Sequence, residues 1–174
     1  MAKPRLRPNR VKLIVSIFSS DPGQFLKAKS ALKRIFGRID FESSVLDFVH
    51  TNYYYEEFGK ELKRKILSFK KLINLKNIYN VKLRTNALER KFSKLGKRTV
   101  NIDPGYIDLS KLVLFSTKDY SHRIYLDKGI FSEVTLFYKE KSFNGWPWTY
   151  PDYGSKLYID IFNSVRQIYE DQLH

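Results

Sequence analysis

Residues 11–19 read VKLIVSIFS, a run of apolar and β-branched side chains. A run of this composition is typical of a central strand that is covered on both faces. A helix is predicted directly after it, because Asp21 can cap the first turn, Pro22 suits the first helical position and Gly37 suits the C-terminal cap. The chain therefore opens with a strand followed by a helix.

Further strands and a second helix are predicted next. One extended strand or two short ones are predicted within Ile39–Val49, and a further strand over Leu62–Lys70. Asn74 can cap a second helix, in which apolar side chains recur every three or four residues as far as Gly96.

After residue 99 the pattern becomes rich in β signals. A short strand at Val100–Ile102, a turn at Asp103–Gly105 and a strand at Leu112–Ser116 are expected. A hairpin around Gly129 joins His122–Leu126 to Ile130–Tyr138, and Ser155 can start a last helix. The order β-α-β-β-α-β-β-β-β-α predicts an α+β fold: a single mixed, mainly antiparallel sheet with about three helices packed on it. We expect a basic tail over residues 1–10 and a single domain over 11–174.

Composition narrows the classes of protein. Hydrophobic residues make up 43% of the 174 residues, enough to expect a folded core, and the chain contains no cysteine. That absence excludes disulfides, thiolate metal sites and a cysteine nucleophile. No run approaches the ~20 apolar residues of a membrane span, so we expect a cytoplasmic protein with no membrane partner.

The net charge of +14 is concentrated in the first part of the chain. Residues 1–100 carry 24 Lys and Arg against 8 Asp and Glu, whereas residues 101–174 carry 8 against 10. Such an imbalance attracts polyanions, including RNA and phosphorylated ligands. Lysines that only keep an aromatic-rich chain in solution are the alternative explanation.

Six stretches carry a resemblance to a known family. They are VKL at 11–13, FGRIDF at 36–41, TNYY at 51–54, NIDPGY at 101–106, STKDYSHRIYL at 116–126 and WTYPDY at 148–153. In these stretches the chain resembles the uncharacterised prokaryotic family catalogued as domain of unknown function 4416. The resemblance covers nearly the whole chain and implies no assigned activity, although members are often labelled GTP-binding proteins.

The GTP label can be tested against the phosphate-binding loop G-x-x-x-x-G-K-[ST]. The nearest match is Gly96-Lys97-Arg98-Thr99, but Lys91 stands where the first glycine is needed, and Arg98 stands where the magnesium-binding hydroxyl is needed. The sequence therefore argues against a P-loop GTPase. A nucleotide bound by another surface stays open.

Side chains suited to acid, base or phosphate chemistry gather in the same stretches. His122, oriented by Asp119 or Asp103, can act as a general base, and Arg123 can grip a phosphate or carboxylate. A histidine held by hydrogen bonds within the fold is the alternative. Further candidate ligand-binding residues are Tyr106, Lys118, Tyr150 and Asp152. No metal motif is present, and the residues identify no cofactor.

A second candidate surface combines aromatic and basic residues. Tyr53 and Tyr54, followed by Lys63 and Arg64, interleave rings and cations as single-stranded nucleic-acid binders do. Tyrosines that anchor a loop in the core are the alternative. We therefore expect binding of RNA or a phosphorylated nucleotide-like ligand first. An enzyme acting on a phosphorylated small molecule is the alternative, and a partner-binding protein using the arm at 146–153 is the third hypothesis.

Overall fold

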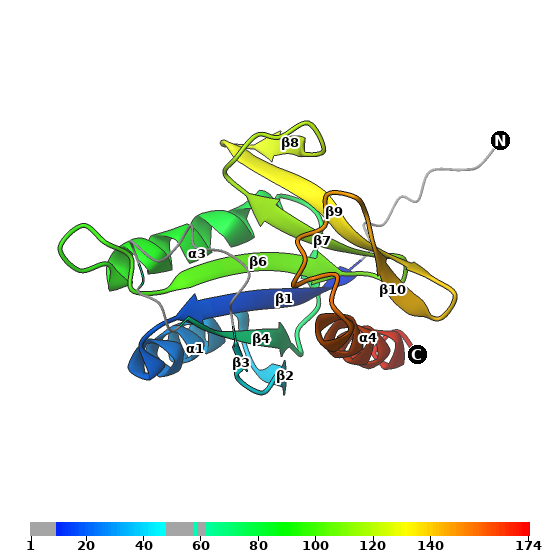
Figure 1. Cartoon of the computed structure of the whole chain (residues 1–174), viewed down its shortest axis with the longest axis horizontal. Coiled ribbons are helices and arrows are strands. Elements are labelled where there is room, and N and C mark those ends of the chain that lie inside the picture. The colour runs from blue at the N-terminus through cyan, green and yellow to red at the C-terminus, as the bar shows by residue number, and fades with distance from the viewer. Residues whose placement is uncertain (1–9, 48–57, 59–61) are drawn as a thin grey trace.

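A computed structural model describes residues 10–47, 58 and 62–174. It contains one ten-stranded sheet with the strand order β10-β9-β7-β6-β1-β4-β2, in which neighbouring strands pair antiparallel (Figure 1). Strand β3 pairs with β4, β5 with β1 and β8 with β9. The predicted α+β class with a mainly antiparallel sheet is confirmed.

The elements have the following bounds. The strands are β1 (Arg10–Ser19), β2 (Ile39–Glu42), β3 (Leu46–Asp47), β4 (Lys63–Phe69), β5 (Ile73–Asn74), β6 (Asn101–Ile107), β7 (Lys111–Ser116), β8 (Ile124–Asp127), β9 (Ile130–Lys139) and β10 (Ser142–Gly145). The helices are α1 (Pro22–Phe36), α3 (Tyr79–Phe92) and α4 (Lys156–Asp171).

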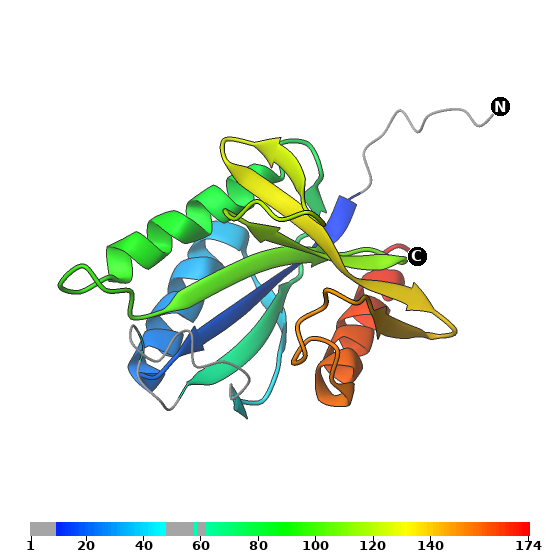
Figure 2. The same ribbon diagram turned by 45° about the horizontal axis from the view of Figure 1, so that its top comes forward.

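Strand β1 lies in the middle of the sheet and explains the long apolar run. Because side chains alternate along a strand, Leu13 and Val15 enter the core under α1 and α3, whereas Ile14 enters a separate core under α4. Figures 1 and 2 show these helices on the two faces of the sheet. A strand buried on both faces has no polar side to present, which is why its sequence does not alternate.

Helix α1 begins and ends where its signals predict. The Asp21 carboxylate accepts a 2.7 Å hydrogen bond from the Gly23 amide, and Pro22 is the first helical residue. Gly37 follows the helix at φ 94°, a backbone conformation that favours glycine. The predicted N-terminal cap, first helical residue and C-terminal glycine of this helix are all confirmed.

The turn expected at Asp103–Gly105 is wrong, because β6 runs straight through these residues. Strand β6 pairs with β1 along its whole length, but its pairing with β7 begins only at Gly105. The Ile102 amide donates to Glu89, away from β1, so by alternation the nitrogen of Pro104 also faces the β7 side. Among the described strands no partner occupies that side before Gly105, so a proline without an N–H is tolerated there.

Three local boundaries also differ from expectation. Asn74 belongs to β5, and its side chain accepts a hydrogen bond from the Lys76 amide instead of capping α3. Helix α3 ends at Phe92, and Gly96 lies in a tight turn beyond it. His122 precedes β8 and lies in a turn. In each case a local side-chain or turn hydrogen bond competes with the regular element.

Two expectations fall on parts of the chain that the structure does not describe. The basic tail lies outside the described residues except for Arg10, which starts β1. Tyr53 and Tyr54 lie outside them altogether. In the described ranges, no helix combines the length and the apolar character that crossing a bilayer requires.

Candidate functional site

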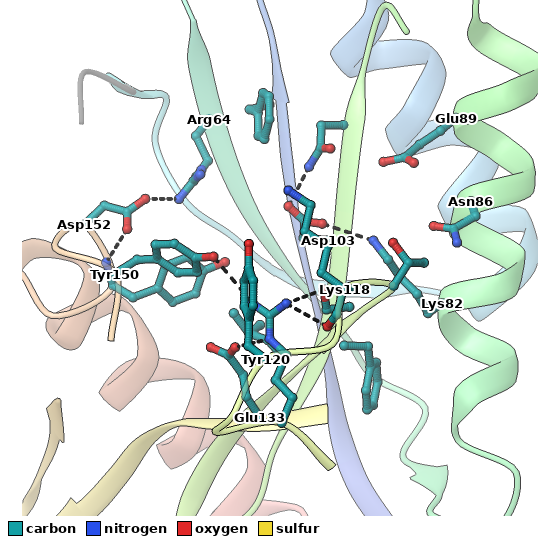
Figure 3. A pocket seen from close by; sticks show the side chains of 18 of the residues that line it. Arg64, Lys82, Asn86, Glu89, Asp103, Lys118, Tyr120, Glu133, Tyr150 and Asp152 are labelled. Carbon is teal, nitrogen blue, oxygen red and sulfur yellow. Dashed lines mark hydrogen bonds and ion pairs between the residues drawn. The ribbon is translucent and has the colours of Figure 1, made fainter. Parts of the chain in front are cut away.

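A cavity of about 660 Å³ opens where β6 and β7 diverge. One wall comes from α3 and the first half of β6, and another from the end of β7 with the segment that follows it. Residues 150–153, the start of β4, and the side chains of Phe18, Arg98 and Glu133 complete the lining. Its charged side chains are Arg64, Lys82, Glu89, Arg98, Asp103, Lys118, Arg123, Glu133 and Asp152. Figure 3 shows many of them directed at the same space.

A buried ion pair joins β4 to the segment before α4. The Arg64 guanidinium donates to the Asp152 carboxylate, and both side chains are only 5% exposed. The other carboxylate oxygen of Asp152 accepts a 2.8 Å bond from the Tyr153 amide. The guanidinium also lies 5.6 Å from the centre of the Phe18 ring and 5.6 Å from that of Tyr153. This cation is therefore held by charge and by aromatic faces.

A second polar group lies on the opposite side of the cavity, around Asp103 (Figure 3). The Asp103 carboxylate accepts from the Lys82 ammonium at 3.1 Å and from the Asn101 amide at 2.5 Å. Desolvation opposes its ionisation, but the nearby Lys82 and Arg64 charges and these hydrogen bonds outweigh that effect and lower the pKa of Asp103. Asp103 is therefore ionised at neutral pH.

Helix α3 satisfies the unpaired edge of β6 with two side chains. The Glu89 carboxylate accepts from the Ile102 amide at 2.6 Å, and the Lys82 ammonium donates to the Ile102 carbonyl at 3.2 Å. Both side chains are buried, and burial raises the pKa of Glu89 above its ordinary value. The two residues take the place of a neighbouring strand at this position.

A third group lies on β9 and the segment after β7. The buried Glu133 carboxylate accepts from Arg123 Nε at 2.7 Å and contacts His122 Nε2 at 3.2 Å. Arg123 Nη1 also donates to the Ser116 hydroxyl at 2.8 Å and to the Lys118 carbonyl at 3.0 Å. Arg123 thus fastens the segment 116–123 to the sheet.

His122 belongs to a row of stacked rings rather than to the cavity lining. Its ring stacks on Trp148 with a centroid separation of 5.6 Å and an interplanar angle of 17°. Trp148 in turn stacks on Trp146 at 5.2 Å and 7°. One nitrogen of the His122 ring also lies beside Glu133, so the ring has contacts within the fold on its face and at its edge.

Six of the predicted site residues line the cavity, and they come from both halves of the chain. They are Arg64, Asp103, Lys118, Arg123, Tyr150 and Asp152. Asp119 and His122 are not among the lining residues. Lys63 pairs with Asp47 at the surface. Tyr106 is packed in the core under α3, where burial raises the pKa of its hydroxyl to about 12.

Sequence reasoning missed four charged lining residues: Lys82, Glu89, Arg98 and Glu133. A signal existed for three of them. Lys82 and Glu89 lie seven residues apart on one helix face, and each directly follows an apolar residue of the helix stripe, Val81 and Leu88. Glu133 stands inside a strand whose other residues are apolar or neutral except for Lys139 at its end. Charged side chains are almost never fully buried unless they are paired, so such interruptions mark a polar site.

No set of three or more His, Asp or Glu side chains within the described ranges is arranged to hold a metal ion. Comparison with curated proteins and with solved structures found no match. The profile of one family matches residues 9–169, nearly the whole chain. The chain belongs to the family described as domain of unknown function (DUF4416).

Proposed function

We propose that the chain binds a phosphorylated small molecule of about nucleotide size in the cavity between β6 and β7. The observation that supports this most is the set of five cationic side chains that line a single cavity of about 660 Å³. Small-molecule sites typically enclose about 300–1,000 Å³. Guanidinium and ammonium groups are the side chains that recognise phosphate oxygens.

The charge balance of the lining favours an anion. Five cations face four carboxylates among the described lining residues. Three of the five cations, Arg64, Lys82 and Arg98, come from the first hundred residues, where the positive charge of the sequence is concentrated. A cavity with this potential raises the local concentration of phosphorylated solutes.

RNA is the alternative ligand that the sequence suggests. A cavity of this size takes one nucleotide and not a strand, and the tyrosines on which the RNA hypothesis depended lie outside the described residues. The alternative of an Asp/His/Arg enzyme site has less support still. Asp103 and Arg123 line the cavity, but Asp119 and His122 do not. We therefore propose binding of a small phosphorylated ligand as the function.

Isothermal titration calorimetry at low salt tests the proposal. The probes are adenosine and guanosine 5′-monophosphates, ribose 5-phosphate, inorganic phosphate and a short single-stranded RNA. We expect binding of at least one phosphorylated small molecule, with affinity that falls as salt is raised. Binding of the RNA alone would favour the alternative, and binding of no probe would contradict the proposal.

A charge variant localises any binding to the cavity. Arg98→Gln with Lys118→Gln removes two cations from the lining. Because hydrogen bonds to charged groups contribute about 1.5–3 kcal/mol each, we expect a loss of affinity of about tenfold or more. The matched control is Lys139→Gln with Lys156→Gln, which removes two exposed lysines that do not line the cavity. Equal losses in both variants would show that net charge and not the cavity attracts the ligand.

A further inference from the structure

The arrangement of charges within the cavity indicates which way a ligand lies in it. We infer, on the basis of the function proposed above, that the ligand is a phosphorylated sugar, free or within a nucleotide. Its phosphate lies at the rim beside Arg98 and Lys118, and its sugar hydroxyls lie inside against the Asp103 carboxylate.

Two of the inner cations already have a buried carboxylate as partner. The Arg64 and Asp152 side chains are each about 5% exposed, and those of Arg123 and Glu133 are 4% and 2% exposed. Such pairs are nearly neutral as units. A phosphate placed among them would also approach the carboxylates of Asp103, Glu133 and Asp152, and like charges repel. The inner cavity therefore suits the uncharged part of a ligand.

The accessible acceptor inside the cavity is the Asp103 carboxylate. Its side chain is 35% exposed, although it lies on a strand in the interior of the sheet. An ionised carboxylate accepts at about four positions, and its bonds from Lys82 and Asn101 account for two of them. An acceptor of this kind recognises hydroxyl or amino donors. It does not recognise a second anion.

The rim carries the cations that a phosphate can reach. The Arg98 side chain is 34% exposed, and Lys118 is exposed in the segment after β7. Both residues line the cavity, one from the approach to β6 and the other from the end of β7. A phosphate at this place meets two cations, of which Arg98 also lies 3.9 Å from a carboxylate oxygen of Glu89.

A short chain of hydrogen bonds joins the rim to the interior. Arg98 Nη1 donates to Asn101 Oδ1 at 2.8 Å, and Asn101 Nδ2 donates to Asp103 Oδ2 at 2.5 Å. One amide group thus separates the guanidinium from the carboxylate. In a pentose phosphate only the ring and one CH2 group separate the 5-phosphate from the 2- and 3-hydroxyls, so one ligand can reach both groups.

The test varies the sugar hydroxyls first, which requires no change in the protein. Calorimetry compares adenosine 5′-monophosphate with its 2′-deoxy and 2′,3′-dideoxy forms, ribose 5-phosphate with 2-deoxyribose 5-phosphate, and adenosine without phosphate. We expect the dideoxy compound to bind about tenfold more weakly or worse, since two hydrogen bonds to a charged acceptor are lost. If ribose 5-phosphate binds as tightly as the nucleotide, the source is a free sugar phosphate. If it binds much more weakly, the source is a nucleotide.

The variant Asp103→Asn then tests whether Asp103 is the group that recognises the sugar hydroxyls. We expect it to reduce the preference for the sugar that bears hydroxyls, whereas Asp160→Asn on α4, an exposed carboxylate outside the cavity, keeps the preference. Phosphorylated probes that bind equally with and without hydroxyls would overturn this inference and leave the proposed function standing. If no phosphorylated probe binds the wild-type chain, both this inference and the proposed function are contradicted. Should Asp103→Asn not fold, the hydroxyl series on the wild-type protein still decides.

Discussion

Asp152→Asn tests how the buried ion pair at the cavity stabilises the fold. The substitution keeps the size of the side chain and an oxygen that can accept the Tyr153 amide hydrogen bond. It removes the negative charge that faces the Arg64 guanidinium, and both side chains of this pair are 5% exposed. The change therefore leaves a buried cation without its carboxylate.

The expected loss is a decrease in the free energy of unfolding, and its size follows from the burial of the ion pair. Removing one partner of a buried pair costs about 3–5 kcal/mol. The Phe18 and Tyr153 rings stay near the guanidinium and retain part of its stabilisation, so we expect a loss near the lower end, about 3 kcal/mol. That is a large share of the 5–15 kcal/mol of a typical domain. For a chain of this length it lowers the melting temperature by about 6–12 °C.

Urea unfolding followed by circular dichroism measures the change, with thermal unfolding as a second reading. The control is the double variant Arg64→Met with Asp152→Asn, which removes the buried charge altogether. We expect the double variant to recover to within about 1 kcal/mol of wild type, because an uncharged pair of similar volume has no buried charge to desolvate. A loss below about 1 kcal/mol for Asp152→Asn, or a double variant no more stable than the single one, would refute the reasoning.

Two further predictions concern β6 and its edge. Gly105→Ala places a Cβ 2.2 Å from the Val113 carbonyl oxygen, so we expect the free energy of unfolding in urea to fall by about 3 kcal/mol or more. The control is Gly145→Ala, whose Cβ meets nothing closer than 3.5 Å and which should lose less than about 1 kcal/mol. Equal losses in the two variants would contradict the close approach of β6 and β7. Because the pKa of Glu89 is raised in the fold, its stabilising contribution is complete below the unfolded pKa of about 4.3 and is lost as pH rises through the folded value. Glu89→Gln should therefore become more stable relative to wild type as pH is raised from about 4 to 7, and a difference that does not change with pH would contradict the burial of this carboxylate.

Local signals predicted the elements whose causes are local. The strand at Val11–Ser19, the cap at Asp21 and the stop at Gly37 each depend on neighbouring residues, and all three are found. The hairpin at Gly129 was predicted for the same reason. Its glycine has φ 75°, and the adjacent strands pair at once on either side. These positions are fixed by short-range geometry that a sequence displays.

The errors arise where distant segments decide the outcome. Proline and glycine at 104 and 105 are typical turn residues, and only the partial pairing of β6 with β7 makes them suitable for a strand. The site follows the same rule. Its lining residues come from β1, β4, α3, β6, β7 and β9 and from the segments around 98, 118 and 151, and no pattern in the sequence brings those elements together.

The divergence of β6 from β7 connects the fold to the site. Gly105 allows the two strands to approach closely at one end, and Pro104 carries no N–H toward the side where they separate. The edge that is opened in this way needs other partners, and Glu89 and Lys82 supply them from α3. Those partners must be charged or polar to satisfy a peptide group, so the gap between the strands is lined by polar side chains. The same Pro104-Gly105 stretch that made the turn prediction wrong therefore also gives this sheet a polar cavity.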